Sequence, residues 1–194
     1  KTDNLGNFLW ASKAGGGAED DSKAIALDGA TNVYIAGSFA GTATFGTTNL
    51  TARGTNGLND AFLARYSSAG AFAWVQQIGG NGADDGYGVT TDNAGNVIVT
   101  GSFFSSATFG TTNLTGNGSD MFVAKYDSAG NVVWVRKAGG NDAIYGDSGR
   151  GVKTDGAGNI YVAGFFSGSG TFGTTNLPTS GFDDLFVAKY DSGG

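Results

Sequence analysis

One seven-residue stretch of this chain occurs three times without a change. It reads Thr-Phe-Gly-Thr-Thr-Asn-Leu and spans residues 44–50, 108–114 and 171–177. The offsets between the copies are 108 − 44 = 64 and 171 − 108 = 63 residues. A fixed period of this length is typical of repeat architectures, in which each repeat is one supersecondary unit that stacks on its neighbours. The period therefore constrains the fold more than any local motif does.

Four short apolar runs recur within each period, and each run has the pattern of a β-strand. In the middle copy they are residues 88–92, 97–103, 120–126 and 132–137. β-branched and aromatic residues alternate along the runs, and Gly, Asn or Asp residues separate them. The first run of the chain, residues 8–13, matches the last run of the period. No window shows a period of 3.6 residues, so the sequence predicts an all-β chain.

Four strands joined in sequence order form an antiparallel meander, and tandem meanders are the blades of a β-propeller. We predict a single domain of three such four-stranded units of about 60–64 residues, at residues 24–78, 88–138 and 151–194. The third unit stops before its fourth strand, whereas the chain opens with one. We therefore predict that the tryptophan strand at 8–14 completes the blade begun at 151–190, either within a ring or between chains. The remaining alternative is that the three units are a segment of a longer chain.

The repeats also resemble a known family. The run 134–140, followed by Asp155 and by residues 158–164, is similar to the bacterial SBBP-type β-propeller repeat, and the same run is legible from Trp10 and from Trp74. The resemblance implies a bacterial propeller that is exported or attached to the cell surface. It implies no catalytic residue.

Composition excludes several classes of function. The net charge is −6 and the Lys and Arg residues are not clustered, which argues against nucleic acid as a partner. The chain has no Cys and no His, so thiol chemistry, disulfides and the commonest general base are absent. No apolar run reaches the roughly 20 residues that a membrane helix needs.

Acidic loops follow the tryptophan runs, and five of their carboxylates are candidate calcium ligands. Ca²⁺ prefers carboxylate and carbonyl oxygens, and Gly-rich loops expose carbonyls. The alternative is that each Asp accepts backbone N–H bonds and fixes the crossing between units. The candidate residues are Asp20, Asp21, Asp84, Asp85 and Asp147. No other metal or cofactor is expected.

The invariant stretch either packs identically in every unit or forms a repeated binding face. Its candidate ligand or interface residues are Thr44, Phe45, Thr47, Asn49, Thr108, Phe109, Thr111, Asn113, Thr171, Phe172, Thr174 and Asn176. Two further sets have structural interpretations. Trp10, Trp74 and Trp134 are predicted to pack between blades rather than to stack on sugars. Asp28, Asp92 and Asp155 are predicted to cap hairpin turns.

These observations favour a non-enzymatic, extracellular or cell-surface β-propeller with a structural or adhesive role. Its expected partner is a second copy of itself, in a closed oligomer or a filament. The alternative is a propeller that binds glycans or surface proteins with one site per blade. An enzyme is the third reading, and its site would fall where the repeat is broken, at the insertion 142–145 or the longer loop 51–59.

Overall fold

The computed structural model describes residues 1–54, 57–140 and 146–194. Within these ranges the chain consists of strands, turns and loops, and no residue is helical. The all-β prediction is confirmed. The insertion at 142–145 and part of the loop 51–59 lie outside the described residues.

Two consecutive units have four strands each. Unit 1 contains β2 (Asp20–Leu27), β3 (Val33–Phe39), β6 (Asp60–Tyr66) and β7 (Phe72–Gly79). Unit 2 contains β8 (Asp85–Thr91), β9 (Val97–Phe109), β10 (Thr112–Tyr126) and β11 (Val132–Ala138). Within each unit every strand pairs antiparallel with the next, as the meander prediction requires.

Unit 3 has three strands in the described chain. They are β12 (Ser148–Thr154), β13 (Ile160–Phe172) and β14 (Thr175–Tyr190), and β14 pairs with β13 alone. The remaining strands, β1 (Ala14–Gly16), β4 (Thr42–Phe45) and β5 (Thr48–Thr51), form a small sheet beside unit 1. The prediction of four strands thus holds for two units, and the third lacks its outer strand.

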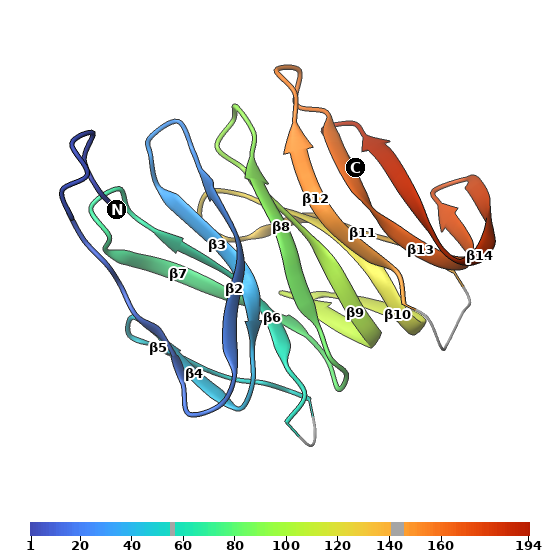
Figure 1. Cartoon of the computed structure of the whole chain (residues 1–194), viewed down its shortest axis with the longest axis horizontal. Coiled ribbons are helices and arrows are strands. Elements are labelled where there is room, and N and C mark those ends of the chain that lie inside the picture. The colour runs from blue at the N-terminus through green and yellow to red at the C-terminus, as the bar shows by residue number, and fades with distance from the viewer. Residues whose placement is uncertain (55–56, 141–145) are drawn as a thin grey trace.

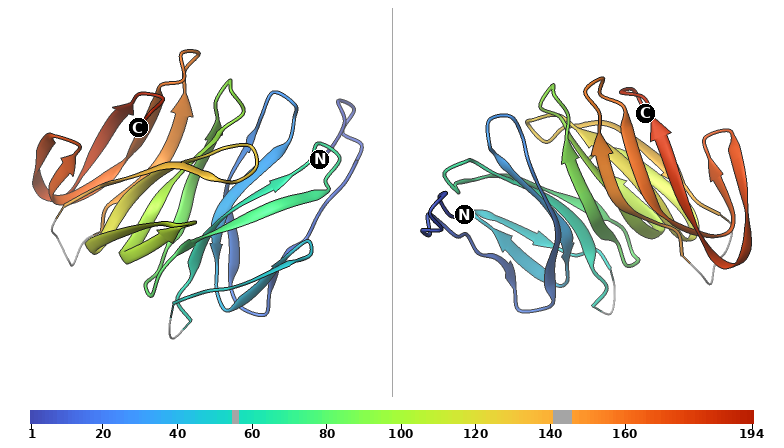
Figure 2. Two further views of the ribbon diagram at one scale, coloured as in Figure 1. Left: turned by 180° about the vertical axis from the view of Figure 1, so that it is seen from behind. Right: turned by 45° about the horizontal axis from the view of Figure 1, so that its top comes forward.

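The units follow one another across the molecule from the N-terminal to the C-terminal side (Figure 1), and no sheet closes on itself. The inner strands β2, β8 and β12 are neighbours along this arc. The two views of Figure 2 show the same open order, with unit 1 and unit 3 at opposite ends. The fold is consistent with propeller blades arranged in an open arc.

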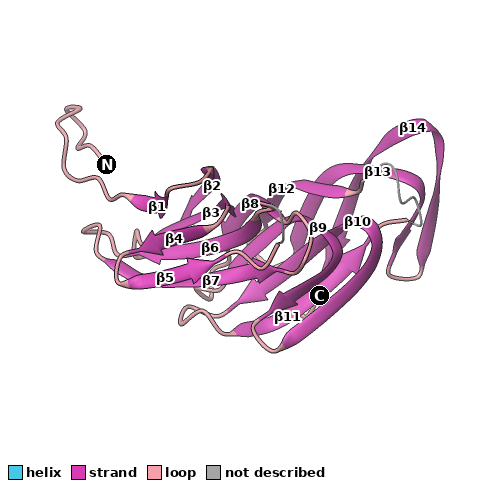
Figure 3. Cartoon of the chain, turned by 90° about the horizontal axis from the view of Figure 1, so that it is seen from below, coloured by secondary structure: helices cyan, strands magenta, loops and turns pink. Residues whose placement is uncertain are grey.

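Three apolar clusters hold the arc together. One fills the seam between units 1 and 2, around Leu63, Phe109 and Phe122. A second fills the seam between units 2 and 3, around Met121 and Val162. The third lies on the outer side of unit 1, where the N-terminal segment covers part of it. Seen from below, that segment projects at one end of the stacked sheets and the β13–β14 hairpin at the other (Figure 3).

The predicted strand at residues 8–13 is not a strand in this chain. These residues make one isolated bridge, between Phe8 and Thr2, and residues 9–13 have no strand partner. A strand needs a neighbour to satisfy its backbone groups, and these residues have none within one chain, so pairing of this segment with another copy stays a prediction. The segment lies along unit 1, at the opposite end of the arc from β14 (Figure 1), so it does not close a ring within the chain.

Candidate interface at the ends of the unit arc

Each seam between units is formed by a forward face, which looks toward the following unit, and a rear face, which looks toward the preceding one. On the forward face of unit 1, Ala61 and Leu63 are fully buried against unit 2. On the forward face of unit 2, Met121 and Val123 hold the same positions and are fully buried against unit 3. The chain therefore builds one type of seam twice.

The forward face of unit 3 carries the same positions in the opposite environment. Leu185 corresponds to Met121 and is 81% exposed, and Val187 corresponds to Val123 and is 72% exposed. Tyr161 on β13 is also exposed on this unit. Because β14 has no second neighbour in the described residues, unit 3 presents both an apolar face and an unpaired strand edge.

The rear face of unit 1 is the other half of an incomplete seam. Ile25 is 68% exposed, whereas its counterparts Val89 and Val152 are each 5% exposed. Leu27, two residues further along β2, is also exposed. Large exposed apolar side chains are informative when they cluster on one face, because such patches mark contact surfaces.

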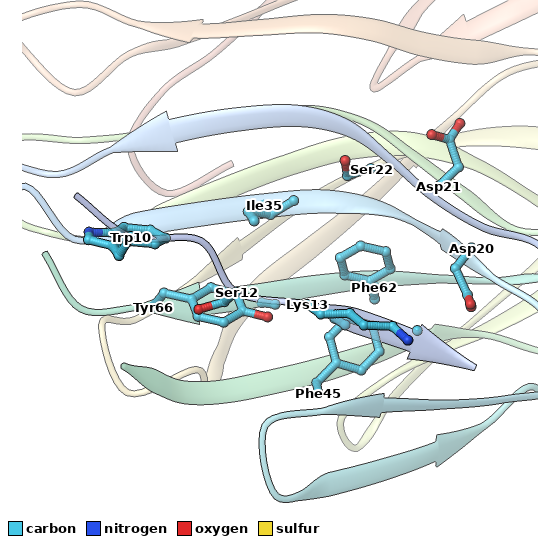
Figure 4. A pocket seen from close by; sticks show the side chains of 13 residues that line it. Trp10, Ser12, Lys13, Asp20, Asp21, Ser22, Ile35, Phe45, Phe62 and Tyr66 are labelled. Carbon is cyan, nitrogen blue, oxygen red and sulfur yellow. The ribbon is translucent and has the colours of Figure 1, made fainter. Parts of the chain in front are cut away.

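A groove of about 270 Å³ opens on this rear face. Figure 4 shows the rings of Phe45 and Phe62 in it beside the N-terminal segment, with Trp10 and Tyr66 together nearer one end. The ring centroids of Phe45 and Phe62 lie 4.8 Å apart. In the seam between units 1 and 2, the counterparts of these two rings share one buried cluster with Leu63. The groove is thus the counterpart of the site that Leu63 fills.

The invariant stretch forms a β-hairpin in every unit. In unit 1 it is β4–β5, in which Phe45 pairs with Thr48 and Gly46 has a φ of 57°. A Gly with positive φ at the first loop position suits a two-residue hairpin turn of type II′. The other two copies are the tips of β9–β10 and β13–β14. The predicted strand runs leave this stretch out, so these strands were missed.

Each of these hairpins pairs backward with the end of a preceding tryptophan run. Gly79 at the end of unit 1 pairs with Thr108, and Gly139 at the end of unit 2 bridges Thr171. In the same way Gly15 of the N-terminal segment pairs with Thr44. The hairpins of units 2 and 3 therefore link neighbouring units, and the hairpin of unit 1 pairs with the N-terminal segment in the same way.

Within the hairpins the predicted interface residues separate into two groups. Phe45 and Phe109 are buried and Phe172 is half-buried, so the aromatic residues belong to the seams. Thr108 is half-buried. The exposed residues are Thr44, Thr47, Asn49, Thr111, Asn113, Thr171, Thr174 and Asn176. Their role in binding stays a prediction.

The three tryptophans occupy one position and make one contact. The indole N–H of Trp74 donates to the carbonyl of Ser128 at 3.1 Å, and that of Trp134 donates to the carbonyl of Ser192 at 3.2 Å. Trp10 donates in the same way to Ser68, at 3.1 Å. Each ring thus packs on the turn of the following unit, and Trp10 occupies the place that a preceding unit's tryptophan would take.

Three of the candidate calcium ligands bind backbone amides. Asp84 accepts the N–H of Gly80 at 2.9 Å and that of Phe104 at 3.2 Å. Asp147 accepts the N–H of Gly140 at 2.6 Å, and Asp20 accepts that of Gly16 at 2.6 Å. These bonds fix the glycine pair at the end of each tryptophan run.

Asp84 is fully buried in the first seam. Burial raises the pKa of its carboxyl to about 8, and the neighbouring carboxylate of Asp60 adds to the rise. Burial also raises the pKa of Asp60 and of its counterpart Asp120, although the nearby Arg53 and Lys137 oppose the effect. Close buried carboxylates favour the protonated form because they repel one another.

Asp85 is tied into a different network. The ammonium of Lys23 on unit 1 donates to its Oδ1, the hydroxyl of Tyr87 donates to its Oδ2 at 3.1 Å, and Asn59 donates at 3.0 Å. Burial opposes ionisation, but hydrogen bonds from Lys23, Ser38 and Tyr87 hold the pKa of Asp85 below its ordinary value. Its counterpart Asp21 is exposed and forms no such ion pair in the described part of the chain.

Asp28, Asp92 and Asp155 lie at the turns between the first two strands of their units. In unit 2, Oδ1 of Asp92 accepts the backbone N–H of Ala94 at 3.0 Å and of Asn96 at 2.9 Å. Its Oδ2 accepts the side-chain amide of Asn96 at 2.8 Å. Asp28 and Asp155 make the corresponding bonds.

The described ranges contain neither a cluster of metal-ligating side chains nor a helix able to span a membrane. In residues 1–54, 57–140 and 146–194, no three His, Cys, Asp or Glu side chains gather where they could hold a metal ion. The carboxylates of the acidic loops therefore stay calcium candidates from the sequence alone. Within the same ranges no helix has the length and apolar character needed to cross a bilayer.

Comparison with known proteins supports the repeat architecture. Residues 73–102 match the family described as a β-propeller repeat, SBBP, so the resemblance of these units to SBBP-type repeats is confirmed. An uncharacterized WD repeat-containing protein of Acanthamoeba polyphaga mimivirus is 29% identical over 158 residues. The match covers 72% of this chain and 11% of that protein, so the chain spans about a tenth of its relative.

Proposed function

We propose that this protein is a non-enzymatic structural or adhesive module of the cell surface that associates with copies of itself. In this association the forward face of unit 3 of one copy sits on the rear face of unit 1 of a second copy. The observation that carries the proposal is the exposure of Leu185 and Val187 at positions that are fully buried in both internal seams. The two end faces are the two halves of a surface that the chain already builds twice.

The positions of the apolar side chains support a second copy of the chain as the partner. Leu63 shares a buried cluster with Phe109 and Phe122. The corresponding groove on unit 1 is lined by Phe45 and Phe62. Val187 holds the position of Leu63 on unit 3, so a second copy supplies an apolar side chain for the groove. Burying such a side chain contributes roughly 1.5–3 kcal/mol.

Strand pairing supports it as well. In unit 2, Met121 on β10 is the partner of Ala138 on β11, and Val123 is the partner of Arg136. Carrying this register to the ends pairs Leu185 with Ala14, and Val187 with Ser12, of a second copy. The N-terminal segment would then be the fourth strand of unit 3. This arrangement removes the unpaired edge, which is otherwise a site of uncontrolled pairing.

Sedimentation velocity across a range of protein concentrations, with negative-stain electron microscopy, tests the association. We expect the wild-type chain to form closed rings or filaments, and Val187→Asp to sediment as a folded monomer. Val133→Asp is the matched control, because Val133 is exposed on β11, away from both end faces. A wild-type chain that stays monomeric at every concentration would contradict the proposal, as would an unchanged Val187→Asp variant.

Cysteine cross-linking tests the register, and the natural chain offers a clean background because it has no Cys. We expect the double variant Ser12→Cys, Val187→Cys to form disulfide-linked multimers on mild oxidation. The control pair Ala11→Cys, Val187→Cys is shifted by one residue, which turns one thiol to the opposite face of the strand. Equal cross-linking of both pairs would exclude the proposed register.

The surface location is supported by composition and by the resemblance to exported repeat proteins. The chain lacks Cys, carries few charges for its length, and is rich in Gly. Protease accessibility on intact cells that express the protein tests the location. Cleavage that requires cell lysis would contradict it.

A second candidate function is favoured by the exposed polar residues of the three hairpins. Thr47, Thr111 and Thr174 are exposed at equivalent hairpin positions, as are Asn49, Asn113 and Asn176. A propeller that binds a glycan or a surface protein through these residues would show about three equivalent sites per chain. A glycan array followed by calorimetry distinguishes it from the structural role, which predicts no such sites.

A further inference from the structure

Each inner strand carries a β-bulge at the same position. The pairing register shifts between Ser22 and Ala24 in unit 1, so Lys23 is the extra residue. The corresponding extra residues are Tyr87 in unit 2 and Arg150 in unit 3. A bulge re-aims the side chain of its extra residue. The repeat thus fixes the place of this side chain but varies its chemistry.

In the first seam the bulge residue makes an ion pair across the units. The ammonium of Lys23 on unit 1 contacts Oδ1 of Asp85 on unit 2. It also lies 4.7 Å from the ring centroid of Tyr87. In the second seam Tyr87 and Ser148 hold the two corresponding positions, so no ion pair of this kind forms there.

Each member of this ion pair has a charged counterpart in the unit at one free end of the arc. Arg150 on unit 3 is the counterpart of Lys23, and Asp21 on unit 1 is the counterpart of Asp85 (85 − 21 = 64). Both are exposed, and neither belongs to an ion pair among the described residues. The guanidinium carbon of Arg150 lies 3.8 Å from the Tyr87 ring centroid. Tyr87 belongs to the preceding unit, so in a single chain the arginine stacks back on unit 2, and pairing with a second copy would replace this stacking by an ion pair.

Other charged residues on the two end faces follow the same division, with mainly basic residues on unit 3 and acidic residues on unit 1. The forward positions of unit 3 carry Lys153, the counterpart of the packed Ala26 of unit 1, and Lys189, the counterpart of Lys125, together with one acid, Asp183, the counterpart of Asn59. The rear positions of unit 1 include Glu19 and Asp20, next to Asp21. All of these end residues are exposed. A basic face and an acidic face on one chain attract each other and repel their own kind.

We infer that Arg150 of one copy pairs with Asp21 of a second copy and so fixes the head-to-tail direction of association. This inference rests on the proposed self-association and adds to it the choice of partner face. A contact between two unit 3 faces would place Arg150 near a second Arg150, which like-charge repulsion disfavours. The chemistry of the partner is therefore that of a second copy presenting its acidic end.

Two charge reversals and their mixture test the inference. Arg150→Asp alone places Asp against Asp21, and Asp21→Lys alone places Lys against Arg150. We expect each variant alone to associate at least about tenfold more weakly than wild type, because like charges meet across the contact. In an equimolar mixture every contact between unlike variants restores an opposite-charge pair. We expect the mixture to recover association and to alternate the two variants.

Sedimentation velocity with one variant fluorescently labelled gives the readout, and circular dichroism checks that each variant is folded. Arg136→Asp is the control, because Arg136 is an exposed arginine on the outer strand of unit 2. Added salt should weaken the wild-type association. If wild type does not associate, the proposed function fails. If Arg150→Asp associates like wild type, or the mixture shows no recovery, only the Arg150–Asp21 pairing is overturned.

Discussion

The seam between units 1 and 2 and the free face of unit 3 present equivalent residues to opposite surroundings. Leu63 is fully buried by unit 2, whereas Val187, at the same position of unit 3, is 72% exposed. Local sequence and strand position are alike, so the difference comes from the presence or absence of a neighbouring unit. Each unit therefore carries a seam-forming face on both sides, and the stability of the unit depends on the neighbour that stacks against each face.

The largest difference in stability between the internal seam and the free end is expected from the phenylalanines of the invariant hairpins. Phe109 is fully buried and lies 5.0 Å from the ring centroid of Phe122. We expect Phe109→Ala to lower the free energy of unfolding by about 3–5 kcal/mol. Phe172→Ala should cost clearly less, because Phe172 is half-buried beside the free end. Urea unfolding followed by circular dichroism measures both, and equal losses would contradict the distinction.

Leu63 and Val187 give a second matched pair. Leu63→Ala removes a fully buried side chain, and we expect a loss of about 2–5 kcal/mol in the free energy of unfolding. Val187→Ala, measured at a dilution that keeps the chain monomeric, should change it by about 0.5 kcal/mol or less. A large loss at Val187 under these conditions would mean that its side chain is already covered within one chain.

The buried carboxylate of the internal seam predicts an unusual pH dependence. The pKa of Asp84 is about 8 in the folded protein against an ordinary value of 3.8. Between these values the folded state binds a proton that the unfolded state releases. Stability contributed by this group is thus complete below about pH 4, falls by up to ~1.4 kcal/mol per pH unit, and levels off above about pH 8.

Asp84→Asn should flatten this slope, because the amide cannot ionise. Asp20→Asn is the control at the free end, where the corresponding carboxylate is exposed. Urea unfolding at a series of pH values between 4 and 9 compares the two variants with wild type. A slope that survives Asp84→Asn would assign the pH dependence to another group.

The smallest expected effect concerns calcium. Asp20, Asp84 and Asp147 each accept backbone N–H bonds, which occupies oxygens that a Ca²⁺ site would need. We expect the melting temperature to be the same in millimolar calcium and in chelator. A calcium-dependent rise that disappears in the double variant Asp84→Asn, Asp85→Asn would restore the calcium site at the seam.

Much of the local structure could be predicted from the sequence. Alternating apolar residues placed strands at residues 97–103 and 120–126, and these form the first part of β9 and the last part of β10. The role of the invariant stretch could not be settled in this way. Phe109 is buried in the seam where its hairpin pairs with the preceding unit, and that contact joins residues far apart in the chain.

The sequence by itself determined the period, the strands and the order in which they pair, because alternation and turn residues act over a few neighbours. Only the tertiary structure decided which copies of a repeated residue are buried. Residues 8–13 have the composition of a strand, but they lack a partner within the chain. Exposure of Leu185 and burial of Met121 follow from what lies beside each unit, since a strand or an apolar face is stabilised by its neighbour.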